Sequence, residues 1–158
     1  MGAFTYETEI VSRIPAAKMF KAGVVDADTL IPKIMPEAIK SVEILEGDGG
    51  VGTTKVIHFG ENDPFKSVRH RVDAIDGDNL SYGYSIIGGD ALGGMLESIA
   101  YRVEVVPKED GGCICKIAGT YHGKEGVELD EEKIKVGENK AVMMFKAIEG
   151  YLLANPEA

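Results

Sequence analysis

The hydrophobic pattern of this chain changes its period once, near residue 130, and that change limits the folds that are open to it. Before this point, polar and apolar residues alternate in short segments such as 54–59, 68–74, 80–86 and 99–105. Glycine clusters separate these segments in the way that turns separate strands. The pattern therefore predicts antiparallel strands followed by one long helix, an α+β domain whose sheet curls around that helix.

The predicted terminal helix has a clear beginning and a continuous apolar face. Asp130-Glu131-Glu132 supplies acidic residues for its first turn, where free backbone amides favour negative charge, and Pro156 marks its end. One helical stripe carries the apolar residues Ile134, Ala141, Phe145, Ile148 and Leu152. About 25 residues at 1.5 Å each make a helix of roughly 37 Å, which is long enough to cross a sheet of this size.

Two short helices are predicted near the amino terminus. Proline suits the first position of a helix over Pro15–Ala22, and Gly23 suits its end. Asp26 is a good cap for a second helix, which Pro32 and Pro36 are expected to stop.

Length and charge restrict the possible functions. The 158 residues suit a single domain, residues 1–158, and the net charge of −9 disfavours stable binding to nucleic acids or anionic membranes. No apolar run approaches the roughly 18 residues of a membrane span, and the first ten residues lack the pattern of a secretory signal. We therefore expect a monomer in the cytoplasm, with the nucleus as an alternative compartment.

The cysteines and histidines do not predict a disulfide or a metal site. Cys113 and Cys115 are two residues apart on a predicted strand, so their side chains point to the same face and cannot easily form a bridge. The three histidines are scattered along the chain, which does not match the ligand spacing of a zinc site. We expect no metal and no cofactor.

A glycine-rich segment contains G-x-G-x-x-G at Gly47, Gly49 and Gly52, with Gly50 between them. A dinucleotide site needs a helix after the last glycine, because the free amides of that helix hold the phosphates. Here the following residues, 54–59, alternate as a strand does. We therefore interpret the segment as a glycine hairpin.

Three tyrosines share one predicted face of the sheet: Tyr82, Tyr84 and Tyr101. A buried tyrosine hydroxyl needs a hydrogen-bond partner. One interpretation is that these hydroxyls reach the sheet edge or backbone carbonyls. The other is a partly polar cavity with apolar walls, as small-molecule sites have. Gly137 lies inside the predicted last helix. If it leaves room beside the helix, it favours the cavity; if it only allows close packing against a neighbouring side chain, it favours the interpretation without a cavity.

Signals of catalysis are weak at the level of individual residues. No nucleophile elbow and no His–Cys arrangement stands out. Glu97 and Glu149 are candidates for an acid–base pair, but a surface carboxylate is usually only a solvated charge.

Several separated motifs resemble those of the plant pathogenesis-related class 10 proteins, the Bet v 1 family, which includes the major birch pollen allergen. The resemblance covers the whole chain without an evident gap. The motifs are Tyr6-Glu7-Thr8-Glu9, Ile14-Pro15-Ala16-Ala17, the glycine-rich Glu46–Thr53, Tyr121-His122-Gly123-Lys124 and Lys146–Leu152.

This resemblance implies a helix-grip fold: a curved sheet of seven antiparallel strands around a long carboxyl-terminal helix, with two short helices after the first strand and a large internal cavity. It also implies an intracellular defence protein that binds amphipathic molecules such as cytokinins, brassinosteroids or flavonoids, for storage, transport or signalling. Transferred by position, the ligand-binding residues are Ile31, Ile39, Phe59, Ser67, Tyr82, Tyr84, Ile99, Tyr101, Val103, Cys115, Ile117, Gly137 and Lys140. Gly23 and Ser67 stand where relatives often have aromatic residues, which predicts a wider cavity.

The resemblance also raises three alternative functions. The lysine, tyrosine and glutamate that norcoclaurine synthase uses correspond to Tyr82, Val68 and His70, so that enzyme's catalytic amine is missing here. The gate and latch motifs of abscisic acid receptors are absent from 60–64 and 88–91. The third alternative is weak ribonuclease activity, with Lys55, Glu97, Glu149 and Tyr151 as the implied catalytic residues.

Overall fold

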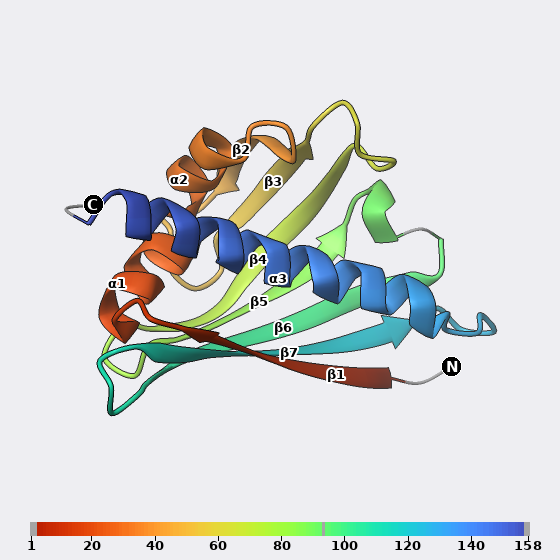
Figure 1. Cartoon of the computed structure of the whole chain (residues 1–158). Helices are drawn as coiled ribbons and strands as arrows, with labels where there is room; N and C mark the ends of the chain where they lie inside the picture. Colours follow the sequence, from red (N-terminus) through yellow and green to blue (C-terminus); the bar gives the residue numbers. More distant parts are fainter. Residues whose placement is uncertain (1–2, 93, 157–158) are drawn as a thin grey trace.

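Seven antiparallel strands form one curved sheet in the order β1-β7-β6-β5-β4-β3-β2, and a long helix lies along its inner side (Figure 1). The computed structural model describes residues 3–92 and 94–156. The strands are β1 (Ala3–Ser12), β2 (Ile39–Glu46), β3 (Thr54–Phe59), β4 (Ser67–Asp76), β5 (Ser81–Gly88), β6 (Leu96–Pro107) and β7 (Cys113–Gly123). The helices are α1 (Ala16–Phe20), α2 (Ala27–Ile34) and α3 (Glu131–Ala154), with a π-helical turn η1 (Lys21–Val25) and a short 3₁₀ turn η2 (Asp90–Leu92). The predicted helix-grip fold is confirmed.

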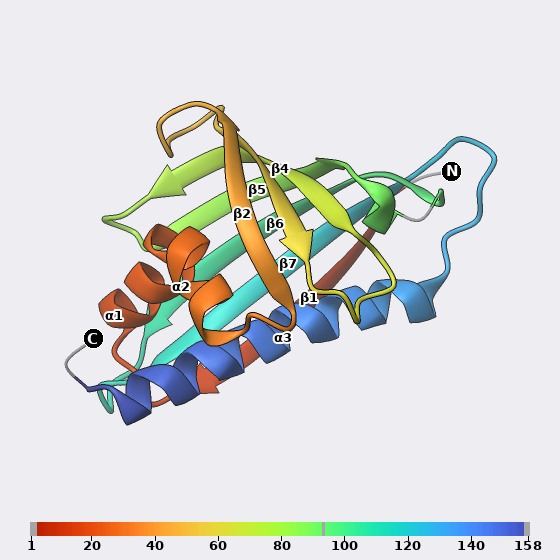
Figure 2. The same ribbon diagram turned by 90° about the horizontal axis from the view of Figure 1, so that it is seen from above.

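The two short helices lie together near the carboxyl-terminal end of α3, as both views show (Figures 1 and 2). The predicted ends of these helices differ from the observed ones. Helical backbone continues from α1 through Gly23 as η1, and Pro32 lies inside α2. Gly23 does not end the first helix because η1 packs tightly against α3 there: a Cβ atom at Gly23 would lie 3.1 Å from Cε1 of Phe145.

The predicted apolar stripe of α3 is confirmed by its burial. Ile134, Phe145, Ile148 and Leu152 are between 1% and 9% exposed and belong to the core between helix and sheet. The helix begins as predicted, because Asp130 is its N-cap and the Asp130 Oδ1 atom accepts a hydrogen bond from the Glu132 amide at 3.0 Å. Among the described residues, no helix is long and apolar enough to cross a membrane.

The glycine-rich segment is the turn between β2 and β3, and several of its amides, those of Gly49, Gly50, Gly52 and Thr53, donate to groups within the protein. Gly47, Gly49 and Gly52 have φ between 90° and 101°, a left-handed backbone that glycine adopts without strain. The amide of Gly49 donates to the Thr53 hydroxyl at 2.9 Å, and the amide of Gly52 donates to the carbonyl of Val72 at 2.8 Å. The residues after the turn form strand β3, not the helix that a phosphate site needs.

Removal of the Asp130 cap is expected to weaken the end of α3. We expect Asp130→Ala to lower the free energy of unfolding by about 1 kcal/mol, because the Glu132 amide loses its partner. Asp130→Asn keeps an accepting oxygen and is the matched control, with little expected change. Chemical denaturation measures both variants, and an equal loss in the two would contradict the cap.

Candidate functional site

A cavity of about 110 Å³ lies between the sheet, α2 and α3. Most of its wall is apolar, and it also has polar groups from three strands and from α2. Its lining consists of Gly23, Val24, Ala27, Asp28, Ile31, Ile39, Val42, Lys55, Ile57, His70, Tyr82, Tyr84, Val103, Ala141, Met144, Phe145 and Ile148. Its mixture of apolar walls and a few polar groups is typical of a small-molecule site.

The strand pattern explains why these side chains face inward. Side chains two residues apart on a strand share a face, which brings Tyr82 and Tyr84 of β5 to the same wall. The register then places Tyr84 opposite Val72 of β4 and Tyr101 of β6. The alternation predicted for β4, β5 and β6 therefore builds one continuous inner face.

An ion pair and a neutral histidine provide polarity in the cavity wall. The Lys55 Nζ atom lies 2.7 Å from Asp28 Oδ1, which links β3 to α2. Burial is the main cause that lowers the pKa of His70 to about 3, and the positive charge of Lys55 is the second cause. His70 is therefore uncharged at neutral pH, and its ring stacks on Tyr84 with a centroid distance of 4.7 Å.

The tyrosines continue from the cavity wall into the core as a row of aromatic rings. Ring centroids lie 5.3 Å apart for Tyr82 and Tyr84, 5.2 Å for Tyr84 and Tyr101, and 6.0 Å for Tyr101 and Tyr121. Burial is the main cause that raises the pKa of Tyr82 and of Tyr101 to about 12. All four phenols are thus neutral hydroxyl groups at physiological pH.

The far end of this row answers the question of where a buried tyrosine hydroxyl finds a partner. The Tyr101 and Tyr121 hydroxyls lie 3.0 Å apart, and the Tyr121 hydroxyl donates to Glu138 Oε1 at 2.9 Å. Of the three predicted tyrosines, Tyr101 thus finds its partner in the Tyr121 hydroxyl of β7, which in turn bonds Glu138 of α3, and not in a backbone carbonyl or at the sheet edge. Gly119 of β7 makes room for this group, since a Cβ atom there would lie 2.6 Å from Glu138 Oε1.

Glu138 is a residue that sequence reasoning missed. Its side chain is 1% exposed, and its Oε2 atom has no hydrogen-bond partner among the described residues. Burial raises the pKa of this carboxyl, and the hydroxyls of Tyr121 and Thr8 lower it by less. The signal was available: Glu138 lies four residues after Ile134 and three before Ala141, on the same helical stripe.

The residues predicted to bind ligand occupy different places. Ile31, Ile39, Tyr82, Tyr84 and Val103 line the cavity. Outside that lining, Ile99, Tyr101, Cys115 and Ile117 are buried core residues, whereas Phe59, Ser67 and Gly137 are half-buried. Lys140 is exposed, forms an ion pair with Asp63 at 3.1 Å, and lies over the rings of Phe59 and Phe65.

The enclosed volume is below the roughly 300–1,000 Å³ typical of ligand pockets. Gly23 does not widen the cavity as expected, because the Phe145 ring packs close to that glycine. Ser67 lies at the start of β4, outside the lining, and its amide donates to Asp90 at 3.0 Å. A ligand of ordinary size therefore requires side chains or α2 to move.

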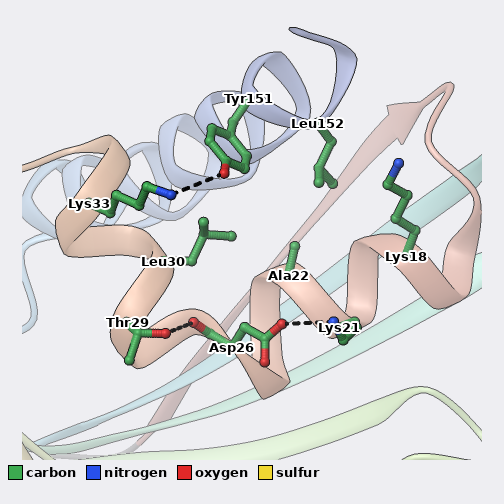
Figure 3. A pocket seen from close by; sticks show the side chains of 9 residues that line it. All are labelled: Lys18, Lys21, Ala22, Asp26, Thr29, Leu30, Lys33, Tyr151 and Leu152. Atoms are coloured by element: carbon green, nitrogen blue, oxygen red, sulfur yellow. Dashed lines mark hydrogen bonds and ion pairs between the residues drawn. The ribbon is translucent and has the colours of Figure 1, made fainter. Parts of the chain in front are cut away.

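A second, open pocket of about 290 Å³ lies on the surface between α1, α2 and the end of α3 (Figure 3). Lys18, Lys21 and Lys33 surround a floor that includes Leu30 and Leu152. These cations are already engaged: Lys21 pairs with Asp26, Lys33 donates to the Tyr151 hydroxyl at 3.4 Å, and Lys18 donates to the Pro156 carbonyl at 2.6 Å.

The four residues named for ribonuclease activity are distributed over several places. Lys55 lines the internal cavity, whereas Tyr151 lines the surface pocket. Glu97 is exposed on β6, and Glu149 is half-buried on α3. No hydrogen bond or ion pair of the described residues joins any two of them, and no described group of three acidic, histidine or cysteine side chains is placed to hold a metal ion.

The buried carboxyl is expected to make stability depend on pH. Because the folded pKa of Glu138 is raised, its contribution to stability is greatest at low pH and is lost as the pH rises above the unfolded value. We compare the free energy of unfolding of Glu138→Gln with that of the unmodified protein. As the pH rises from about 4 to neutral, we expect this difference to increase in favour of Glu138→Gln by on the order of 1 kcal/mol.

Chemical denaturation of Glu138→Gln and of the unmodified protein, each at about pH 4 and at neutral pH, measures this difference in the free energy of unfolding. Glu128→Gln removes an exposed carboxyl just before α3 and is the matched control, for which no comparable pH-dependent gain is expected. A Glu138→Gln difference that is the same at both pH values would show that burial does not perturb this carboxyl.

Comparison with known proteins agrees with the fold and covers nearly the entire chain. The major allergen Pru ar 1 of Prunus armeniaca is 56% identical over 158 residues, which cover 100% of this chain and 99% of the relative. The major strawberry allergen Fra a 1.05 of Fragaria ananassa is 55% identical over 156 residues, 99% of this chain and 98% of the relative.

A solved structure shows the same architecture at lower identity. The crystal structure of Ara h 8.0201 matches with a TM-score of 0.88 and 41% identity, over 98% of this chain and 100% of that one. The sequence profile of the Pathogenesis-related protein Bet v 1 family matches residues 1–155. The chain is therefore a member of the Pathogenesis-related protein Bet v 1 family.

Proposed function

We propose that this protein binds a hydrophobic or amphipathic small molecule in its internal cavity, as an intracellular plant defence protein that stores, transports or senses that molecule. The observation that carries the proposal is the cavity itself, which has mostly apolar walls and a few polar groups. Phytohormones and flavonoids are the ligand classes that the family resemblance suggests. We further propose that the protein acts as a monomer in the cytoplasm.

The cavity wall supplies both affinity and orientation in this proposal. Burial of apolar ligand surface against Ile31, Val103 and Phe145 favours binding by roughly 25 cal/mol per Å². The Tyr82 hydroxyl and the Lys55–Asp28 pair are polar groups in the same wall and would orient a polar substituent.

Helix α2 is the wall best suited to move when a ligand enters. None of its residues is fully buried, although Ala27, Asp28 and Ile31 line the cavity. The Asp28–Lys55 ion pair connects α2 to β3. Asp28 is one-third exposed but Lys55 is only 9% exposed, so separation of the pair has a cost, because it leaves the buried Lys55 cation without its partner. Outward movement of α2 would enlarge the cavity toward the size of an amphipathic ligand.

Binding is favoured over ribonuclease activity because the implied catalytic residues do not form one site. Phosphoryl transfer needs an activated nucleophile and a group that stabilises the developing anion within reach of the same phosphate. Lys55 and Tyr151, the two candidate donors, line different pockets.

A ligand screen by thermal shift tests the binding proposal directly. Ligands at a hundred times their dissociation constant stabilise a protein by about 2.7 kcal/mol, which corresponds to a rise of roughly 5–10 °C for a domain of this size. We expect such a rise for at least one class among cytokinins, flavonoids, brassinosteroids, abscisic acid and fatty acids. A flat response to all five classes would contradict the proposal.

A cavity-filling variant tests whether the ligand binds inside. Ala141 lies on the inner face of α3 and lines the cavity, so Ala141→Leu is expected to reduce affinity by at least about tenfold, since it occupies part of a small volume. Met143→Leu is the matched control, because Met143 is 64% exposed on the same helix. Calorimetric titration measures both, and equal affinities would show that the ligand binds elsewhere.

A further inference from the structure

The Glu138 carboxyl is a buried acid without a cation. It is 1% exposed, and its Oε1 accepts one hydrogen bond from Tyr121. The Thr8 hydroxyl is near enough to lower the pKa of the carboxyl, but Oε2 has no partner within hydrogen-bond distance among the described residues. None of the ion pairs between described residues includes it. Native proteins usually satisfy such groups, so an unsatisfied one needs an explanation.

This carboxyl lies next to the cavity along α3. Ala141 lines the cavity, and Glu138 precedes it by three residues, so the two side chains are neighbours on one helical face. Across from them, the aromatic row leads in the same direction: Tyr84 lines the cavity, Tyr101 stacks on it, and the Tyr101 hydroxyl meets that of Tyr121. Glu138 and Tyr101 are not in the lining itself, so the carboxyl lies one layer of side chains beyond the cavity wall that Ala141 and Tyr84 form.

The other charged groups of the cavity are already balanced. Lys55 and Asp28 pair with each other at 2.7 Å, and His70 is neutral. An anionic ligand would find the Lys55 charge compensated and the Glu138 oxygen repulsive. A cationic ligand would find an uncompensated acceptor, and aromatic faces also attract cations.

We propose that the ligand of this cavity carries a protonated amine on an apolar skeleton, and that Glu138 is the group that pairs with this amine. The proposal rests on the proposed function, because it assumes that the cavity takes up a ligand. It deepens that function by naming the ligand class as cationic amphiphiles. The amine would complete the missing interaction of Oε2, and the rings of Tyr84 and Tyr101 would surround the cation.

Three probes that share one ring system test the charge preference. 2-Naphthalenemethylamine is cationic at neutral pH, 2-naphthalenemethanol is neutral, and 2-naphthoic acid is anionic. We expect the amine to bind the unmodified protein at least about tenfold more tightly than the alcohol, since hydrogen bonds to charged groups contribute more than neutral ones. The acid is expected to bind more weakly than the alcohol. Calorimetric titration measures all three.

Two variants assign the preference to Glu138. Glu138→Gln keeps the shape of the side chain but removes its charge, so we expect the amine to lose its advantage over the alcohol. Glu128→Gln removes one exposed carboxyl and is expected to keep the full advantage. Tyr121→Phe removes a donor to Oε1, leaves the carboxylate in place, and is expected to keep the amine preference.

The outcomes separate this inference from the proposed function. If the alcohol binds as tightly as the amine, the amine inference is wrong and the binding function stands. An amine preference that survives in Glu138→Gln would also overturn it, because the charge must then lie elsewhere. If none of the probes binds and the thermal-shift screen is flat as well, both proposals fail. The comparison of probes on the unmodified protein remains decisive even if Glu138→Gln does not fold.

Discussion

The contact between the apolar face of α3 and the inner face of the sheet is the interaction on which the rest of the structure depends. Ile134 near one end of the helix and Leu152 near the other are both almost fully buried, so the contact extends along nearly the whole element. A curved sheet of seven strands has two free edges and one concave face, and that face needs an apolar cover. Helix α3 provides that cover, and the cavity is the part of the interface that its side chains leave unfilled.

The cavity is located where helix and sheet do not fill the space between them. Toward the carboxyl-terminal half of α3, Phe145 approaches Gly23 of η1 and closes the interface. Beside it, Ala141 and Val103 are too small to fill the space, and α2 closes the opening with half-buried residues only. A rigid sheet and helix with one loosely held wall suit a site that must open for a ligand and close around it.

The amino-terminal half of α3 carries the polar counterpart of this arrangement. Glu138 takes a position on the stripe that would otherwise be apolar, and the protein accommodates it with Gly119, Tyr101 and Tyr121. Burial of a carboxyl costs stability, and one oxygen of this group has no partner among the described residues. A group that costs stability just behind a cavity wall is more easily explained by recognition than by folding.

The sequence by itself determined the class of fold, the position of the four strands β3, β4, β5 and β6, the acidic cap of α3 and its apolar stripe. These features depend on local rules, namely the alternation of side chains along strands, the spacing of apolar residues on helices and the satisfaction of free amides at a helix end. The ends of the short helices were not predicted correctly, because packing of Gly23 against Phe145 outweighs the preference of glycine for a helix end. Only the tertiary structure decided which inward residues line a cavity and which are core. It placed Tyr84 at the wall and Tyr101 behind it, and it brought Glu138 of α3 to Tyr121 of β7. Such contacts join residues that are far apart in the chain, and no local pattern specifies them.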